Sequence, residues 1–281
     1  MQKRTGIVAA VAAVAILGAV ALVRTTSPVE VEATAGVARP ATQQATPAAG
    51  APAATAVAPQ QAAPSPASTP AAPAPRWSAA GALFDGAPDA LGAHFCSASV
   101  VDSPRGDTLI TAAHCVTDGD GTPPRTGMLF VPGYSDGVAP FGAWTVTAAA
   151  VDPRFVADAD VEADVAFLTV SRPDSPPIEA VTGAFRLATD PGAVNNVEVY
   201  GLPDTDEAPT IRAGTTSQPS EHQLQLDALG LYDGVSGGPW VRDGDQVIGV
   251  TGGYEQGGST PDVSYATYLG PDVAGLLARL D

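Results

Sequence analysis

Short apolar runs separated by turn-forming residues fill the chain beyond residue 77. They occupy residues 109–111, 128–131, 165–170, 197–200 and 247–251, with Gly, Pro, Asp and Asn gathered between them. Such runs predict antiparallel strands, hence an all-β sandwich or barrel. Only residues 271–280, which end in an Ala/Leu-rich stretch, have a helical pattern. The length of this region is enough for two packed β-barrels followed by a short C-terminal helix.

The N-terminal segment has a different pattern, because residues 5–23 are nineteen consecutive uncharged and mostly apolar positions. As a helix they extend about 28 Å, close to the thickness of a bilayer core. Lys3 and Arg4 precede the run, so we expect the remainder of the chain to be exported. The length of the run favours a retained signal anchor over a signal peptide cleaved after residues 33–35.

A region rich in Pro and Ala separates this segment from the strand-forming part. Residues 27–75 contain ten prolines and no aromatic residue, and no charge occurs between positions 40 and 75. Such a composition buries too little apolar surface to fold. We therefore expect a signal peptide or signal anchor over 1–24, a disordered linker over 25–75 and one folded domain over 76–281. The linker is either an inert spacer or, in the functional interpretation, a stalk that spans a cell wall.

Charge and composition exclude several classes of protein. The chain has 13 Lys and Arg against 30 Asp and Glu, a net charge of −17, so nucleic acid is not an expected ligand. Two cysteines and three histidines do not supply a Cys/His zinc cluster, and 30 Gly with 27 Pro argue against a long-helix bundle. We expect neither a metal nor an organic cofactor.

Two sequence motifs carry the residues for nucleophilic catalysis. His114 lies just past the apolar run at 109–113, and Ser236 lies in the sequence Gly-Val-Ser-Gly-Gly-Pro. A serine hydroxyl is a weak nucleophile until a neighbouring base takes its proton, and His114 is the candidate base. The glycines leave the backbone free to direct the N–H groups of Gly234 and Ser236 at one point, where they form an oxyanion hole.

Such a base needs a carboxylate that holds its tautomer and stabilises its protonated form. Asp164 directly precedes the apolar run at 165–170, so a rigid strand would direct it inward. Asp158 and Asp160 lie in a more polar segment and are the weaker choices. The remaining histidines, His94 and His222, have no such context. We interpret them as structural, and the three tryptophans, at positions 77, 144 and 240, as packing residues.

The segments at 111–115, 164–167 and 234–239 together resemble the three signatures of the chymotrypsin/trypsin-like serine peptidases, in the family order His, Asp, Ser. The similarity covers roughly residues 81–273 and is strongest to compact secreted actinobacterial members. It implies two packed β-barrels, peptidase activity and a disulfide between Cys96 and Cys115. The alternative for the cysteines is two separate buried thiols.

The sequence departs from this family at the residue before the nucleophile. Many members carry an aspartate there that pairs with a newly cut amino terminus, whereas this chain has Val235. A valine cannot bind an ammonium group. We therefore expect the domain to be competent without proteolytic processing.

The resemblance also assigns the substrate-binding residues. The pocket floor falls on Gly230, so the aspartate with which some members bind Lys or Arg is missing. Asp262, on the expected opposite wall, either supplies that charge or is an exposed loop residue. Thr251, Gly252 and Gly253 follow a predicted strand where the family pairs its backbone with the substrate. Thr251 is also the candidate for the family serine that supports the aspartate.

The leading interpretation is an extracytoplasmic, monomeric serine endopeptidase that cleaves protein or peptide substrates through an acyl-enzyme. Ser236 attacks, His114 transfers the proton and Asp164 orients His114. Two alternatives remain open. One is a catalytically silent binding module displayed on a stalk, and the other is an esterase with the same mechanism.

Overall fold

The structure is a computed structural model that describes residues 76–227, 231 and 233–280. The expected membrane segment at 5–23 and the linker over 25–75 lie outside these residues and stay predictions. Within the described ranges, no helix has both the length and the apolar character that a membrane crossing requires.

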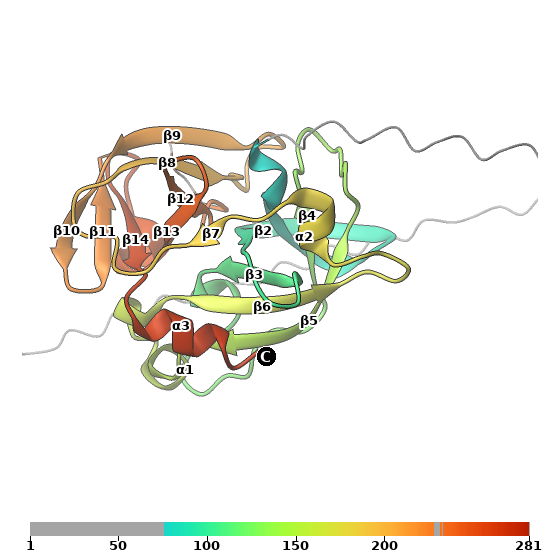
Figure 1. Cartoon of the computed structure of the whole chain (residues 1–281), viewed down its shortest axis with the longest axis horizontal. Coiled ribbons are helices and arrows are strands. Elements are labelled where there is room, and N and C mark those ends of the chain that lie inside the picture. The colour runs from blue at the N-terminus through green and yellow to red at the C-terminus, as the bar shows by residue number, and fades with distance from the viewer. Residues whose placement is uncertain (1–75, 228–230, 232, 281) are drawn as a thin grey trace, which may run out of the picture. The chain divides into compact units, whose positions relative to one another are not determined.

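Six antiparallel strands form a closed barrel in the first half of the described chain (Figure 1). The strands are β1 (Ala80–Ala87), β2 (Ala90–Val100), β3 (Thr108–Thr111), β4 (Met128–Pro132), β5 (Trp144–Val151) and β6 (Ala166–Ser171). Neighbouring strands follow the order β1-β2-β3-β6-β5-β4. The continuous apolar run at 165–170 matches β6, and four of the six residues of this strand are buried.

The second half forms an eight-stranded sheet. Its strands are β7 (Arg186–Leu187), β8 (Asn196–Gly201), β9 (Thr210–Thr215), β10 (Ser217–Ser220), β11 (Gln223–Leu226), β12 (Pro239–Arg242), β13 (Gln246–Thr251) and β14 (Ser264–Tyr268). Seven follow the order β10-β11-β14-β13-β12-β8-β9, and the short β7 pairs with β13 in parallel. The edge strands β9 and β10 are not paired with each other, so the described residues form an open sheet here.

The helices are short and lie around the sheets. They are the α-helices α1 (Pro153–Asp158), α2 (Ile178–Thr182) and α3 (Asp272–Leu277), and the 3-10 helices η1 (Arg76–Ala79), η2 (Ala113–Cys115), η3 (Val161–Ala163) and η4 (Tyr254–Gly257). In Figure 1, α3 crosses in front of β5 and β6, which it contacts. The helix predicted over 271–280 is thus confirmed as a shorter one.

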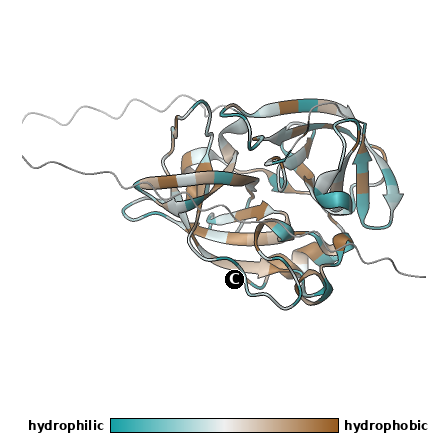
Figure 2. Ribbon diagram, turned by 180° about the vertical axis from the view of Figure 1, so that it is seen from behind, coloured by the Kyte–Doolittle hydropathy of each residue, from teal (hydrophilic) through white to brown (hydrophobic). Residues whose placement is uncertain are grey.

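One hydrophobic core joins the two sheets. Leu109 and Ile110 of the barrel belong to the same buried cluster as Tyr200, Val241 and Val250 of the second sheet. A separate cluster around Trp240 fills the second sheet. Figure 2 shows the alternating hydrophobic and polar bands along the strands. The predicted all-β class with two packed halves is therefore confirmed, although the second half is an open sheet instead of a closed barrel.

Candidate active site

Strand pairing brings His114 and Asp164 to the same end of the barrel. Strands β3 and β6 are antiparallel neighbours, with Thr111 opposite Ala166. His114 follows the end of β3 in the helix η2, and Asp164 directly precedes β6. Because the end of one strand lies beside the start of the other, two residues fifty positions apart meet there.

Asp164 is 1% exposed and binds His114 through both of its oxygens. Its Oδ2 atom lies 2.7 Å from Nδ1 of His114, and its Oδ1 atom accepts from the backbone N–H of His114 at 2.9 Å. Oδ2 also accepts from the backbone N–H of Gly253 at 2.7 Å, and the Thr267 hydroxyl donates to the Asp164 carbonyl. A buried carboxylate with these partners holds the ring so that Nδ1 carries the proton and Nε2 is free to act as a base.

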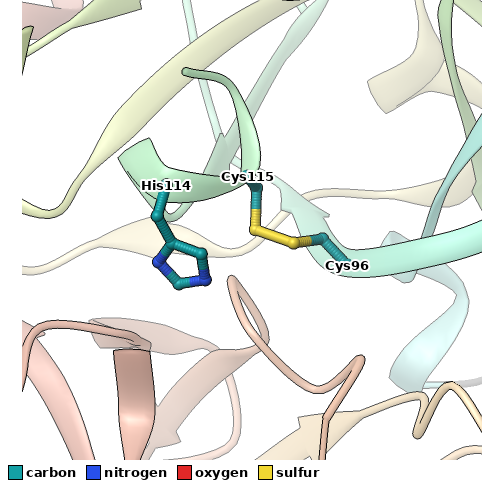
Figure 3. Close-up of side chains that lie close together, drawn as sticks. All are labelled: Cys96, His114 and Cys115. Carbon is teal, nitrogen blue, oxygen red and sulfur yellow. A yellow bond between two sulfur atoms is a disulfide. The ribbon is translucent and has the colours of Figure 1, made fainter. Parts of the chain in front are cut away.

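A disulfide lies beside this pair. Cys96, in β2, and Cys115, next to His114, are bonded, as the resemblance implied. Figure 3 shows the imidazole of His114 beside this disulfide, pointing from the barrel toward the ribbons of the second sheet. The bond ties η2 to β2 and so limits the movement of the segment that carries the base.

The second sheet supplies the candidate nucleophile. Ser236 lies in the loop before β12, and residues 252–253 follow β13. Because β12 and β13 pair with Pro239 opposite Val250, this loop and the end of β13 lie side by side. Ser236 is therefore held on the part of the second sheet that contacts Asp164 through Gly253.

The loop also has the backbone geometry for an oxyanion hole. Gly234 has φ of +89°, and a Cβ atom there would lie 2.3 Å from the backbone N of Asp204 and 2.8 Å from the Leu202 carbonyl oxygen. Any side chain would therefore clash with the backbone as well as strain this conformation. Among the described residues, the N–H groups of Gly234 and Ser236 have no hydrogen-bond acceptor. This is the arrangement that an oxyanion hole requires.

His114, Gly234 and Ser236 line one cavity of about 350 Å³. Other lining residues come from both halves: His94, Phe95, Cys96, Cys115, Asp118, Arg125, Asp204, Asp233 and Gln256. The structure thus brings together the predicted nucleophile, base and oxyanion-hole donors at one concave surface. The Asp164 carboxylate lies behind His114 and lines a second, adjoining cavity with Gly253 and Gln256.

A carbonyl group of the chain itself contacts the nucleophile. The Ser236 hydroxyl donates to the Gln256 carbonyl oxygen at 3.3 Å, and the described residues show no hydrogen bond from it to His114. Gln256 lies in η4, where Glu255 and Gln256 have φ of +51° and +54°. Such values are unfavourable for residues with a side chain. A hydrogen bond to Glu162 raises the pKa of Tyr254 above its ordinary value and ties this turn to η3.

The predicted substrate-binding residues have other contacts or lie outside the described residues. The Thr251 hydroxyl accepts from Trp240 Nε1 at 3.0 Å, so it faces the second core, and the backbone of Gly253 gives Asp164 the support expected from it. Asp262 is exposed and lines neither cavity. Gly230 lies outside the described residues. The assignments of Gly230, Thr251, Gly252, Gly253 and Asp262 to substrate binding stay predictions.

The remaining candidates have packing or turn positions. His94 packs edge-on against Phe84, with ring centroids 5.6 Å apart, although it also borders the cavity. His222 lies between β10 and β11, where its carbonyl accepts from Tyr268. Trp144 and Trp240 are fully buried, as expected of packing residues. Asp160, one of the weaker acid candidates, caps η3 by accepting from the N–H of Glu162.

Three contributors to the site have no signal in the sequence. The Thr267 hydroxyl of β14 donates to the Asp164 carbonyl, and the Gln256 carbonyl accepts from the Ser236 hydroxyl. The Ser97 hydroxyl of β2 donates to the Gly234 carbonyl in the loop that carries Ser236. These contacts join residues that are at least twenty positions apart. Since neither a motif nor a fixed spacing links them, only the folded chain identifies them.

Among the described residues, one group of side chains has the spacing of metal ligands. The ligand atoms of Cys96, His114 and Cys115 lie within 4.8 Å of one another. Both sulfur atoms belong to the disulfide, and a thiolate is needed for metal binding. The proximity of these three residues is therefore explained by the disulfide and by the position of His114 next to Cys115.

Comparison with known proteins points to peptidases. The family model for the trypsin-like peptidase domain matches residues 96–250, whereas no curated protein sequence matches the chain. The thermostable serine protease AL20 from an extremophilic microorganism superposes with a TM-score of 0.64 and 23% identity, over 73% of this chain and 98% of that one.

Two further solved structures share the fold. Protease Anisep from Arthrobacter nicotinovorans gives a TM-score of 0.62 at 22% identity, over 71% of this chain and 93% of its own. A Glu endopeptidase gives 0.59 at 13% identity, over 75% and 94%. At these identities the superpositions show a common fold.

Proposed function

This chain belongs to the trypsin-like peptidase family, and from that premise we propose that it is an extracytoplasmic serine endopeptidase. The observation that carries the proposal is the convergence of four groups: the buried Asp164 carboxylate, the His114 ring bound to it, the Ser236 hydroxyl and the N–H of Gly234. They come from separate segments of both halves of the molecule. We expect a monomer that uses neither a metal nor an organic cofactor.

In the proposed reaction, His114 Nε2 takes the proton of the Ser236 hydroxyl while the serine oxygen attacks the carbonyl carbon of the peptide bond. The carbonyl oxygen becomes an oxyanion, which accepts from the N–H groups of Gly234 and Ser236. His114 then gives its proton to the leaving amine, and the C–N bond breaks. Water, activated by His114, hydrolyses the acyl-enzyme and restores the Ser236 hydroxyl. Asp164 stabilises the protonated ring in both halves of the reaction.

One observation favours a different function, a catalytically silent binding module. The Ser236 hydroxyl is bonded to the Gln256 carbonyl instead of to His114. In the peptidase, the Ser236 hydroxyl must leave the Gln256 carbonyl and turn to His114, which rotation of the serine side chain allows. The two functions therefore differ in whether Ser236 reacts with an acylating or phosphonylating reagent.

A fluorophosphonate probe tests the proposal. We expect the full-length chain to take up one probe molecule per chain, detected by intact mass, and Ser236→Ala to take up none. Hydrolysis of a peptide library should fall about 10⁶-fold in the same variant, since the nucleophile is lost. A folded, disulfide-bonded protein that does not react, either uncut or after cleavage near residue 81, would rule out the peptidase and leave the binding module. Faster turnover of esters with no amide cleavage would identify an esterase.

The same experiment tests competence without processing. Val235 is buried in the core of the second sheet and supplies no carboxylate for a new amino terminus. We expect the uncut full-length chain to react at the same rate as a chain cleaved near residue 81. Activity that arises only after that cleavage would contradict this expectation.

Two observations support a location outside the cytoplasm. The chain carries a disulfide, which persists in oxidising compartments, and the apolar stretch at 5–23 has the length of a membrane helix. We expect protease added to intact cells to remove the domain and membrane fractions to retain it. Recovery of a shortened chain from the medium would instead indicate a cleaved signal peptide, and recovery from the cytosol would contradict export.

A further inference from the structure

Ser97 of β2 is a buried polar residue that the proposed mechanism does not use. It is fully buried, it lies next to the disulfide residue Cys96, and it crosses from the barrel to the loop of the nucleophile. Its N–H donates to the Ser236 carbonyl at 2.7 Å. Its hydroxyl donates to the Gly234 carbonyl at 3.2 Å and accepts from the N–H of Leu202 at 3.0 Å.

These contacts surround a donor of the oxyanion hole. The Ser236 N–H belongs to the peptide group between Val235 and Ser236. Ser97 binds the carbonyl of the preceding peptide group and the carbonyl of the following one. Because each peptide group is planar, these bonds fix the planes on either side of the Ser236 N–H, and the Gly238 N–H binds the Val235 carbonyl of the plane between them. Two bonds from one residue therefore restrict the rotation of the donor between them.

Ser97 is itself held in place. Its carbonyl accepts from the Thr111 hydroxyl at 2.8 Å, and Thr111 is the last residue of β3, three positions before His114. A short path of hydrogen bonds thus runs from β3, the strand that precedes His114, through Ser97 to the loop that contains Ser236. The Val235 side chain packs in the second core and offers no charged contact that would fix this loop.

We propose that Ser97 is a positioning residue, whose hydroxyl holds the loop at 234–237 in the conformation that directs the N–H groups of Gly234 and Ser236 at one point. Its role in catalysis rests on the proposed peptidase function, whereas its role in holding the loop does not. The hydroxyl acts through the backbone and does not touch the substrate.

The chain provides a matched control two residues further along the same strand. Ser99 is also fully buried in β2, but its hydroxyl has no hydrogen-bond partner among the described residues. Ser97→Ala and Ser99→Ala remove the same atom from the same strand. Only the first leaves the Leu202 N–H and the Gly234 carbonyl without a partner.

The first measurement is peptide hydrolysis by the full-length chain. We expect Ser97→Ala to lower kcat about 10- to 100-fold with little change in KM, because misplaced donors weaken binding of the transition state more than of the substrate. The affinity for a peptidyl boronate, which mimics the tetrahedral intermediate, should fall in parallel. Ser99→Ala should leave all three values unchanged. Equal kcat and boronate affinity in the two variants would overturn the catalytic role.

The second measurement does not depend on activity. Hydrogen exchange followed by mass spectrometry should show faster exchange at Leu202, Gly237 and Gly238 in Ser97→Ala but not in Ser99→Ala. The Leu202 N–H binds the Ser97 hydroxyl itself, and the other two N–H groups bind Thr251 and Val235 and so report on the loop that Ser97 holds. Unchanged exchange would overturn the positioning role even in an active enzyme. A wild-type chain that is inactive both uncut and after cleavage near residue 81 would overturn the peptidase proposal, and hydrogen exchange would still decide the role of Ser97.

A second pair of variants guards against misfolding of Ser97→Ala. Ser97→Thr and Ser97→Val have nearly equal volume and suit a strand, and they differ in the presence of a hydroxyl. We expect Ser97→Thr to have a higher kcat than Ser97→Val and slower hydrogen exchange at the Leu202 amide. Equal behaviour of the two would count against the hydroxyl.

Discussion

The two halves of the candidate site are held in different ways. On the barrel side, the buried Asp164 carboxylate accepts three hydrogen bonds, two of them from the ring and the backbone N–H of His114. The adjacent strands β3 and β6 fix the positions of these two residues. On the other side, Ser236 lies in a loop, and its hydroxyl has one hydrogen bond, at 3.3 Å, to the carbonyl of Gln256 in a turn of positive φ. The candidate base is prearranged, whereas the position of the candidate nucleophile depends on the conformation of its loop.

The difference follows from the backbone that carries each group. His114 and Asp164 lie next to strands whose ladder of hydrogen bonds sets their separation. Ser236 lies among glycines, which allow the left-handed conformation of Gly234 but do not by themselves select it. The loop therefore needs contacts from elsewhere, and Ser97 supplies them from the barrel. Substitutions on the two sides should accordingly have different effects.

The largest effect is expected on the barrel side, from Asp164→Asn. The amide can no longer accept at both positions and holds His114 in the wrong tautomer, so kcat should fall about 10⁴-fold, equivalent to about 5.5 kcal/mol. The measurement is kcat for a reporter peptide. Asp160→Asn, in the same segment, is the control and should retain full activity because Asn also caps η3. A loss of less than tenfold in Asp164→Asn would show that the base is not oriented by this carboxylate.

Removal of the disulfide should have an intermediate effect, on stability. The bond joins residues 19 positions apart, so Cys96→Ala combined with Cys115→Ala should lower the free energy of unfolding by about 3 kcal/mol. Urea unfolding of the native and double-variant chains measures this difference. The nucleophile side should keep its hydrogen-exchange pattern while η2 exchanges faster. A change in stability below about 1 kcal/mol would mean that the barrel holds the base without the bond.

The smallest of these effects is expected where the two sides touch. A Cβ atom on Gly252 would lie 2.7 Å from Asp164 Oδ2, so Gly252→Ala must displace the carboxylate. We expect a loss of about 10- to 100-fold in kcat, as for other displacements of supporting groups. Gly275→Ala is the control, because nothing lies within 4 Å of its Cβ position. Unchanged kcat in Gly252→Ala would show that Asp164 tolerates a shift.

Sequence patterns located much of this architecture. The runs at 109–111, 128–131 and 247–251 lie in β3, β4 and β13, because short apolar segments between turn residues have few other ways to bury their side chains. The family resemblance implied the disulfide between Cys96 and Cys115, and the structure contains it. The open form of the second sheet was not foreseen, since closure depends on pairing between edge strands that local sequence does not encode.

The residues of the candidate site also fall into those that local sequence identified and those that only the fold revealed. Residue types and order by themselves determined the candidates His114, Asp164 and Ser236, because the chemistry of each is written in its local motif. Only the tertiary structure decided that the backbone N–H of Gly253, instead of Thr251, donates to Asp164. It also decided that the Ser236 hydroxyl donates to the Gln256 carbonyl and that the Ser97 hydroxyl donates to the loop of Ser236. Each of these is a contact between segments far apart in the chain. The packing of the two sheets fixes such contacts, and no local preference specifies them.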